Sequence, residues 1–167
     1  MLERLIARGL FHFTDERNLD RIRSARGLLS IVAQREYGFE CAFPGGNAWS
    51  READRRFGLD SYVHLCFFDE HPMEYCARKD GRIKKSRFLR VDGRVLRQAG
   101  ARITPGVSNE RNMEILTVRE ALERLDIDAI VERLNWRDPD QWRRVLSARK
   151  YEVLIPRKVP ITLISRL

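Results

Sequence analysis

The chain has 167 residues, a length that fits one domain around a single hydrophobic core, and we expect residues 1–167 to form that domain. Hydrophobic residues make up 43% of the chain, but no stretch approaches the roughly 20 continuous apolar residues of a membrane span, and the N-terminus lacks a secretory signal, which predicts a cytoplasmic protein. The net charge is +8, from 32 Lys and Arg against 24 Asp and Glu, which favours a polyanionic partner.

The chain opens on a strand followed by a helix. Residues 10–13 form a short apolar and aromatic run that predicts the strand, and Thr14 is placed to cap the helix. Residues 15–25 carry apolar side chains three positions apart among charged ones, and Gly27 stands where a helix is expected to end.

A loop and the central strand come next. Residues 38–59 contain a Pro-Gly-Gly-Asn sequence and a charged string, which predicts a long functional loop. Residues 62–68 are rich in strand-forming residues and nearly all apolar, as in a central strand that is buried on both faces. Pro72 then suits the first turn of a short helix through Ala77.

The second half mixes both element types. Residues 88–91 alternate like a strand and residues 93–99 predict a short helix or turn, while Thr117 and Glu120 have capping-box spacing and open another helix. Asp138 opens a helix that runs to Leu146.

The chain closes on two predicted strands. They cover residues 151–156 and 160–164 and are joined by a basic turn at 157–159. Strands and helices therefore follow one another without strict alternation, which predicts an α+β fold.

Neither the cysteines nor the histidines have metal-binding spacing. Cys41, Cys66 and Cys76 contain no C-x-x-C pair, and the three histidines form no H-E-x-x-H arrangement. We therefore expect reduced thiols in a reducing compartment and no metal site.

Glu152 is the most unusual residue of the C-terminal half because it interrupts an apolar strand. An unpaired buried carboxylate is costly, so a carboxylate here has either a partner or a function. The alternative is an edge strand whose outer face meets water.

His12 presents a similar choice. It faces away from Phe11 and Phe13, and its ring could donate a hydrogen bond to a sugar hydroxyl; the alternative is a structural histidine. His64, inside the predicted central strand, is interpreted as such a structural histidine.

The arginines of the predicted loop are candidates for an anionic ligand. Arg51, Arg55 and Arg56 carry guanidinium groups that match phosphate geometry, although a solvated charge run accounts for them equally well. The glycine patterns of Walker and Rossmann nucleotide sites are absent, which disfavours both.

Four segments together resemble the DarT family of ADP-ribosyltransferases, toxins that modify single-stranded DNA and are countered by a macrodomain antitoxin. They are Phe11–Thr14 with Asn18-Leu19; Tyr62–Phe68 with Pro72–Tyr75; Ser108–Asn112; and Trp142–Arg144 with Lys150–Pro156. Their order and spacing cover nearly the whole chain.

The resemblance implies an ADP-ribosyltransferase fold, a split antiparallel β-sheet that holds NAD in a cleft. By position, it implies that NAD is bound by His12, Thr14, Asn18, Leu19 and Tyr75.

The resemblance also implies catalytic residues. Glu152 would be the catalytic glutamate, and Arg56 is favoured among the three loop arginines as the catalytic arginine. A carboxylate beside the ribose can stabilise the positive charge left when the nicotinamide bond breaks, and can accept the acceptor's proton. We expect the nucleic acid to be contacted by Arg51, Arg55, Arg111 and Arg144.

One departure from the family pattern concerns the acceptor. The family commonly has Arg-Ser before its Pro-Met, whereas this chain has Glu70-His71. The resemblance predicts transfer of ADP-ribose to a base of single-stranded DNA, by a toxin or phage-defence effector. RNA or protein as the acceptor, or a non-enzymatic basic nucleic-acid-binding domain, are the alternatives.

Overall fold

The structure is a computed structural model that describes residues 1–39, 42–165 and 167. The expectation of a reduced Cys41 lies outside these residues. The helices are α1 (Leu2–Arg8), α2 (Leu19–Ser24), α3 (Ile31–Tyr37), α4 (Ala48–Arg56), α5 (Pro72–Lys79), α6 (Val118–Arg124), α7 (Asp128–Val131) and α8 (Pro139–Ala148). Short 3-10 turns are η1 (Glu16–Asn18), η2 (Leu59–Ser61), η3 (Gly93–Arg97) and η4 (Ile161–Leu163).

The strands form two antiparallel sheets. They are β1 (Leu10–Asp15), β2 (Gly27–Leu29), β3 (Tyr62–Cys66), β4 (Ser86–Val91), β5 (Arg102–Thr104), β6 (Leu116–Thr117), β7 (Glu152–Pro156), β8 (Lys158–Pro160) and β9 (Ile164–Ser165). The large sheet has the order β6-β5-β7-β3-β1-β4-β9, and β2 pairs with β8 in a small one. The mixture of helices with antiparallel sheets confirms the α+β prediction.

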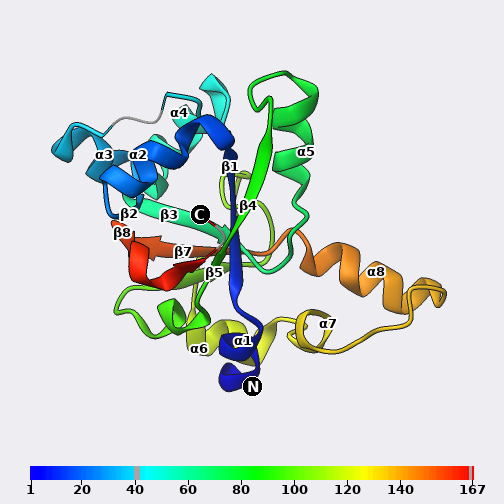
Figure 1. Cartoon of the computed structure of the whole chain (residues 1–167). Coiled ribbons are helices and arrows are strands. Elements are labelled where there is room, and N and C mark those ends of the chain that lie inside the picture. The colour runs from blue at the N-terminus through cyan, green and yellow to red at the C-terminus, as the bar shows by residue number, and fades with distance from the viewer. Residues whose placement is uncertain (40–41, 166) are drawn as a thin grey trace.

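The large sheet is split between β1 and β3. These neighbours share one register pair, Phe11 with Cys66, whereas β1 pairs with β4 over its whole length from Leu10 to Asp15. The two halves consequently diverge, and β1 and β4 run across the direction of β3 and β7 (Figure 1). Helices α2, α3 and α4 gather on the side where the halves separate, while α1, α6 and α7 lie at the opposite end (Figure 1).

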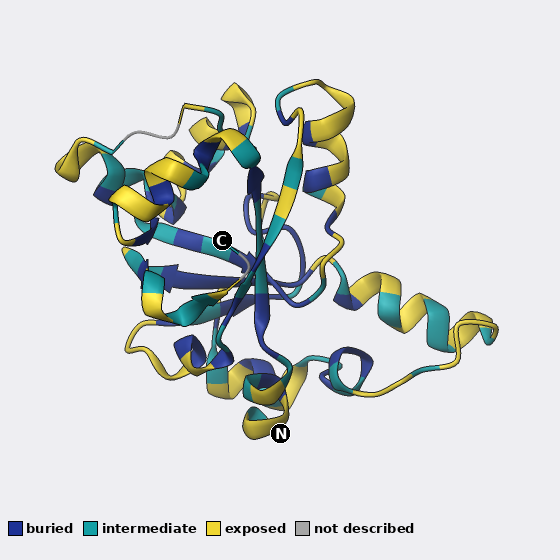
Figure 2. Cartoon of the chain, in the orientation of Figure 1, coloured by how far each residue is buried: buried dark blue, intermediate teal, exposed yellow. Residues whose placement is uncertain are grey.

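The core lies where the strands cross. Buried apolar side chains form one cluster that draws on the chain from Leu5 to Val159, and Phe67 is its largest fully buried member. Burial of each Val, Leu, Ile or Phe side chain in the cluster contributes about 1.5–3 kcal/mol. The strands are accordingly mostly buried, whereas α8 extends outward with only Ala148 buried (Figure 2).

The main predicted strands and helices are present. Strands β1, β3, β4 and β7 and helices α5, α6 and α8 lie where the sequence places them. The capping box of Thr117 and Glu120 forms as its spacing predicts. The cap after β1 was assigned wrongly: Asp15, not Thr14, accepts the hydrogen bond from the Arg17 backbone.

Two other predictions were wrong. The loop predicted over residues 38–59 contains α4, which Asn47 caps by accepting from the Ser50 backbone. The strand predicted over residues 160–164 is mostly η4. After a bend at Arg157, which has a left-handed conformation (φ 60°), the chain enters β8 at once and pairs with β2 in the small sheet, where a turn over residues 157–159 was expected.

No helix within the described ranges is long and apolar enough to cross a membrane.

Candidate active site

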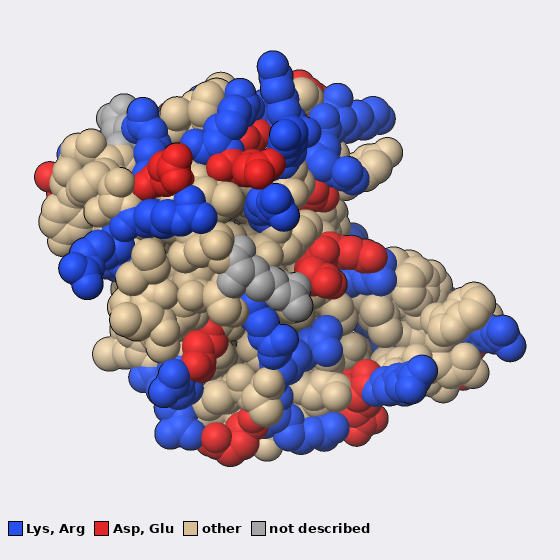
Figure 3. Space-filling model, in the orientation of Figure 1, with Lys and Arg blue, Asp and Glu red and all other residues tan. Residues whose placement is uncertain are grey.

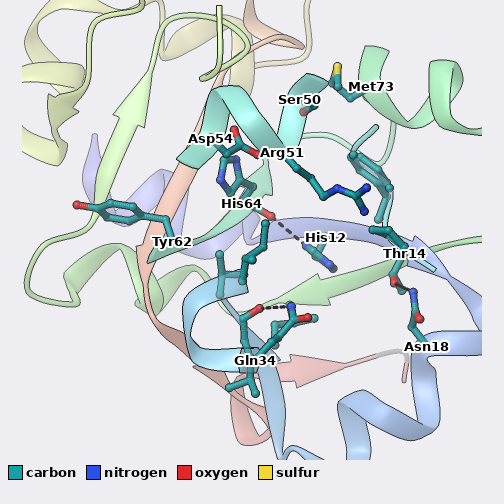
Figure 4. Close-up of a pocket in the computed structure, with 18 of the residues that line it drawn as sticks. His12, Thr14, Asn18, Gln34, Ser50, Arg51, Asp54, Tyr62, His64 and Met73 are labelled. Atoms are coloured by element: carbon teal, nitrogen blue, oxygen red, sulfur yellow. Dashed lines mark hydrogen bonds between the residues drawn. The ribbon is translucent and has the colours of Figure 1, made fainter. Parts of the chain in front are cut away.

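The opening between the two halves of the sheet contains a cavity of about 540 Å³. This volume falls within the range of about 300–1,000 Å³ that is usual for sites of small molecules and cofactors. Its lining comes from β1, α2, β2, α3, α4, β3, the first residue of β7, Met73 of α5 and the segments around residues 43–46 and 107–109. Figure 4 shows part of this lining.

Glu152 and His12 both line this cavity, although 140 residues separate them in the chain. Glu152 begins β7, which lies between β5 and β3, so the alternative of an edge strand with a wet outer face is wrong. Only 6% of Glu152 is exposed. A carboxylate buried in the middle of a sheet needs partners.

Three donors converge on one oxygen of Glu152. The Ser108 hydroxyl donates to Oε2 at 2.6 Å, the Ser108 backbone N–H lies 3.3 Å away, and His64 Nδ1 lies 3.2 Å away. The other oxygen, Oε1, is 3.6 Å from His71 Nε2. These contacts fix the orientation of the carboxylate.

The same contacts determine its charge. Burial of Glu152 opposes ionisation, but the hydrogen bond from His64 and the charge of that ring outweigh burial, so the pKa of Glu152 lies below its ordinary value. Burial also opposes protonation of His64, yet the carboxylate beside it raises the pKa of His64 to about 9. Glu152 is therefore an anion at neutral pH.

His12 is held in one tautomer. Its Nδ1 lies 2.9 Å from the backbone oxygen of His64, which only accepts, so Nδ1 is the donor. Burial lowers the pKa of His12 and keeps the ring neutral. Nε2 is then an acceptor, so His12 is suited to accept a hydrogen bond from a ligand hydroxyl through Nε2 instead of donating one.

The other residues expected to contact NAD differ in position. Thr14 and Asn18 line the cavity, and Asn18 also holds the backbone of Phe43 by two hydrogen bonds. Leu19 packs against the hydrophobic core and does not line the cavity. Tyr75 is 59% exposed on α5, where Met73 is the cavity residue instead.

The loop arginines lie on α4 and face different ways. Arg51 and Arg55, four residues apart on one helix face, line the cavity, whereas the next residue, Arg56, does not. Arg51 and His12 point into the same space (Figure 4).

The last two expected arginines lie elsewhere. Arg111 is exposed in the segment before β6, and Arg144 on α8 makes two hydrogen bonds to the carboxylate of Asp126. Neither lines the cavity.

Several site residues were missed. His64, interpreted from the sequence as structural, contacts Glu152, and Asp54 of α4 lies beside it (Figure 4). Asp54 is buried, which raises its pKa, and its Oδ1 has no hydrogen-bond partner among the described residues. His64 is two residues from Cys66, the register partner of Glu152, so both side chains share one face of the sheet.

The described residues contain no group of three or more His, Cys, Asp or Glu side chains that could hold a metal ion.

A family model described as "ssDNA thymidine ADP-ribosyltransferase, DarT" matches residues 11–167, nearly the whole chain. The chain belongs to the DarT family. Membership makes it an NAD-dependent ADP-ribosyltransferase of single-stranded DNA, as the resemblance implied.

Solved DarT structures share the fold. DarT of Thermus sp. 2.9 in complex with ADP-ribosylated ssDNA matches with a TM-score of 0.68 at 22% identity, over 93% of this chain and 78% of that one. The same protein in complex with NAD+ matches with a TM-score of 0.63 at 22% identity and the same coverage. Thermosipho africanus DarTG in complex with ADP-ribose has a TM-score of 0.70 at 19% identity, over 94% of this chain and 42% of that one.

No curated protein matches the sequence. At about 20% identity, the DarT structures establish the split antiparallel fold of this chain.

Proposed function

We propose that Glu152 carries the transfer of ADP-ribose from NAD to a thymine base of single-stranded DNA. In this step the bond between nicotinamide and the ribose carbon breaks, and its electron pair leaves with neutral nicotinamide. The ribose carbon then bonds to a nitrogen of the base. Because N1 of thymine carries the deoxyribose, N3–H is the one N–H of the base, and its proton passes to Glu152.

The observation that carries this proposal is the buried, ionised carboxylate at the cavity. An anion held beside the ribose stabilises the positive charge that develops on its carbon, and a fixed anion needs no reorganisation during the reaction. The hydrogen bonds from Ser108 hold Glu152 in such a fixed position.

We propose Arg51 instead of Arg56 as the arginine that acts in the cavity. A guanidinium can bind the pyrophosphate of NAD through paired hydrogen bonds. Arg51 lines the cavity and Arg56 does not, which supports this choice. Arg55 lies at the same wall and suits either NAD or the DNA backbone.

His12, Thr14 and Asn18 are proposed to bind NAD. His12 offers a ring acceptor for a ribose hydroxyl, and Asn18 joins β1 to the cavity wall at Phe43. Leu19 supports this wall from the core, and Tyr75 lies on the outer surface of α5, where it suits contact with the nucleic acid.

A basic segment at residues 78–87 offers a path for the DNA. It contains six cationic side chains and one acidic one: Arg78, Lys79, Arg82, Lys84, Lys85 and Arg87, with Asp80. It adjoins the cavity because Ile83 approaches Gly45, a cavity residue. Lys and Arg side chains gather over the upper part of the face shown in Figure 3. Such a surface attracts a phosphate backbone. Arg111 and Arg144 would contact more distant nucleotides.

The biological setting is a further part of the proposal. Residues 1–167 are proposed to act as one cytoplasmic domain, which the single core cluster supports. The family resemblance supports a toxin or phage-defence role with a macrodomain antitoxin.

The test combines labelled NAD with separate pools of single-stranded DNA, duplex DNA, RNA and protein. We expect label on single-stranded DNA that contains thymine and none on thymine-free DNA. Label on RNA or protein alone would instead select one of the alternative acceptors.

Glu152→Gln should lower transfer by at least about 1,000-fold, because an amide neither stabilises the cation nor accepts the proton. NAD affinity, measured by calorimetry, should change by less than about threefold. The matched control is Glu110→Gln, which removes an exposed carboxylate and should retain full activity. Undiminished labelling by the Glu152 variant would refute the assignment.

A further inference from the structure

Glu152 lies between two histidines whose ring nitrogens have different partners. His64 places Nδ1 at 3.2 Å from Oε2 of the carboxylate and Nε2 at 3.2 Å from the backbone oxygen of Leu59. A backbone oxygen and a carboxylate only accept hydrogen bonds. Both nitrogens of His64 must therefore carry protons, which makes the ring an imidazolium.

The Ser108 hydroxyl does not change this conclusion. It lies 3.2 Å from His64 Nδ1, but its proton is directed to Oε2 of Glu152 at 2.6 Å. Asp54, which lies beside the ring (Figure 4), adds a second carboxyl group that favours the cation.

His71, in contrast to the cationic His64, is neutral. The Met73 backbone N–H donates to its Nδ1 at 3.3 Å, so Nδ1 keeps a lone pair and the single proton of the neutral ring lies on Nε2. A second cation is disfavoured here by burial, by the nearby His64 and by the N-terminus of α5, which His71 caps. Nε2–H faces Oε1 of Glu152 at 3.6 Å and has no hydrogen-bond partner among the described residues.

The two oxygens of Glu152 are consequently unequal. Oε2 receives the Ser108 hydroxyl, the Ser108 N–H and His64, whereas no hydrogen bond to Oε1 from a described residue is shorter than 3.5 Å. Oε1 is the oxygen with lone pairs left for substrate.

We infer that His64 and His71 are positioning residues for Glu152. The cationic His64 fixes Oε2, and the neutral His71 presents its Nε2–H to Oε1 at 3.6 Å without a hydrogen bond, so Oε1 keeps the lone pairs that meet the ribose and accept the proton from the acceptor base. This inference rests on the proposed role of Glu152. Glu152, His64 and His71 then have separate roles, and the proton is taken up at Oε1 of Glu152.

The protonation states are testable without any activity measurement. The chain has only three histidines, so nitrogen-15 spectra of the imidazoles are simple to assign with single-histidine variants. At about pH 7.5 we expect His64 with both nitrogens protonated, His71 as the neutral Nε2–H tautomer and His12 as the neutral Nδ1–H tautomer. A neutral His64 in the unmodified protein would overturn the inference.

Glu152→Gln serves as the matched variant for these spectra. Without the carboxylate, the His64 ring should lose its charge at the same pH while the backbone spectrum stays folded. An unchanged imidazolium in this variant would show that another group holds the proton and would also overturn the inference.

Kinetics test the positioning. His64→Leu removes both donors, and we expect kcat to fall about 100-fold, with the KM for NAD changed by less than about threefold. His64→Gln keeps one donor and should restore part of the loss. Unchanged kcat in His64→Leu would contradict the role.

His71→Asn separates capping from positioning. Asn is a strong N-cap residue and should preserve α5, but it removes the ring that faces Oε1. We expect kcat about tenfold lower and an unchanged melting temperature, and full activity would contradict the role of His71. The proposed function and the roles of the histidines can be tested separately. Full activity of Glu152→Gln would refute the proposed function, whereas the spectra alone decide the protonation states of the histidines.

Discussion

A carboxylate in the middle of a sheet is stable only because its neighbours favour the anion. Ser108 and His64 supply the donors for Glu152, and they come from two different parts of the chain. At the residue scale, the site is therefore an electrostatic arrangement whose members are assembled by the fold.

Arg51 and Arg56 provide a matched pair of variants that tests the role of a single side chain in the cavity. Both are exposed arginines of α4, but Arg51 alone lines the cavity. Arg51→Ala should lower kcat/KM for NAD by about 100-fold or more, because a cation facing the pyrophosphate is lost. Arg56→Ala should stay within about threefold of the unmodified protein, as steady-state kinetics will show. Equal losses in both variants would indicate a general charge effect.

How far the sequence reveals the site depends on the residue. Glu152 could be identified because a charge interrupts an apolar strand, and this signal is local. His64 could not, because its contact with Glu152 depends on the register of β3 against β7. The side of α4 on which Arg51 lies was equally hidden, since residues 38–59 had been predicted as a loop.

At the scale of elements, one side chain joins the first half of the sheet to the cavity wall. Asn18 donates to Thr14 Oγ1 at 3.1 Å and to the Phe43 backbone oxygen at 2.9 Å, and accepts from the Phe43 N–H at 3.2 Å. The Arg17 guanidinium stacks over the Phe43 ring at 3.5 Å. The wall at Phe43 is thus fixed by residues that follow β1.

Asn18→Ala should loosen this wall. The variant leaves half-buried backbone groups of Phe43 without their side-chain partner, so we expect a free energy of unfolding lower by about 1–2 kcal/mol and a KM for NAD raised about fivefold. Denaturant unfolding and kinetics measure the two effects. Thr14→Val is the control for the free energy of unfolding, because within the protein it removes only the hydrogen bond between Asn18 and Thr14; a loss of stability as large as that of Asn18→Ala would contradict the role of the Phe43 contact.

The helices and strands differ in how readily the sequence predicts them. Strands β3 and β7 were predictable because each is an apolar run, broken only by His64 in β3 and by Glu152 in β7, between turn residues. Helix α4 was missed because its buried positions are polar, Ser50 and Asp54, so it has no apolar stripe. The end of the chain was predicted wrongly because Arg157 takes a left-handed conformation without being a glycine or asparagine, and because β8 pairs with the distant strand β2.

At the scale of the whole molecule, the cluster around Glu152 links stability to pH. The pKa of His64 is raised to about 9 in the folded protein from an ordinary value of 6.5. A raised pKa contributes stability that is fully present below 6.5 and is lost as pH rises through 9. His12 and His71, whose pKa values are lowered, act oppositely and reduce stability as pH falls below about 6.5.

We therefore expect the melting temperature to be highest near pH 6.5 and to fall by roughly 5 °C or more towards pH 9. Scanning calorimetry across this range measures the effect. His64→Leu should flatten the alkaline side of the curve and leave the acid side in place, since His12 and His71 remain. A flat alkaline side in the unmodified protein would contradict the ion pair between His64 and Glu152.

The single register pair between β1 and β3 has a wider consequence. Because the cavity lies where two halves of a backbone sheet part, its frame is set by strand pairing more than by the side chains that line it. Substitutions along its walls can then alter which nucleotide enters while the hollow itself persists. A framework of this kind tolerates extensive sequence drift, which accounts for a shared architecture among proteins that agree at only about one position in five.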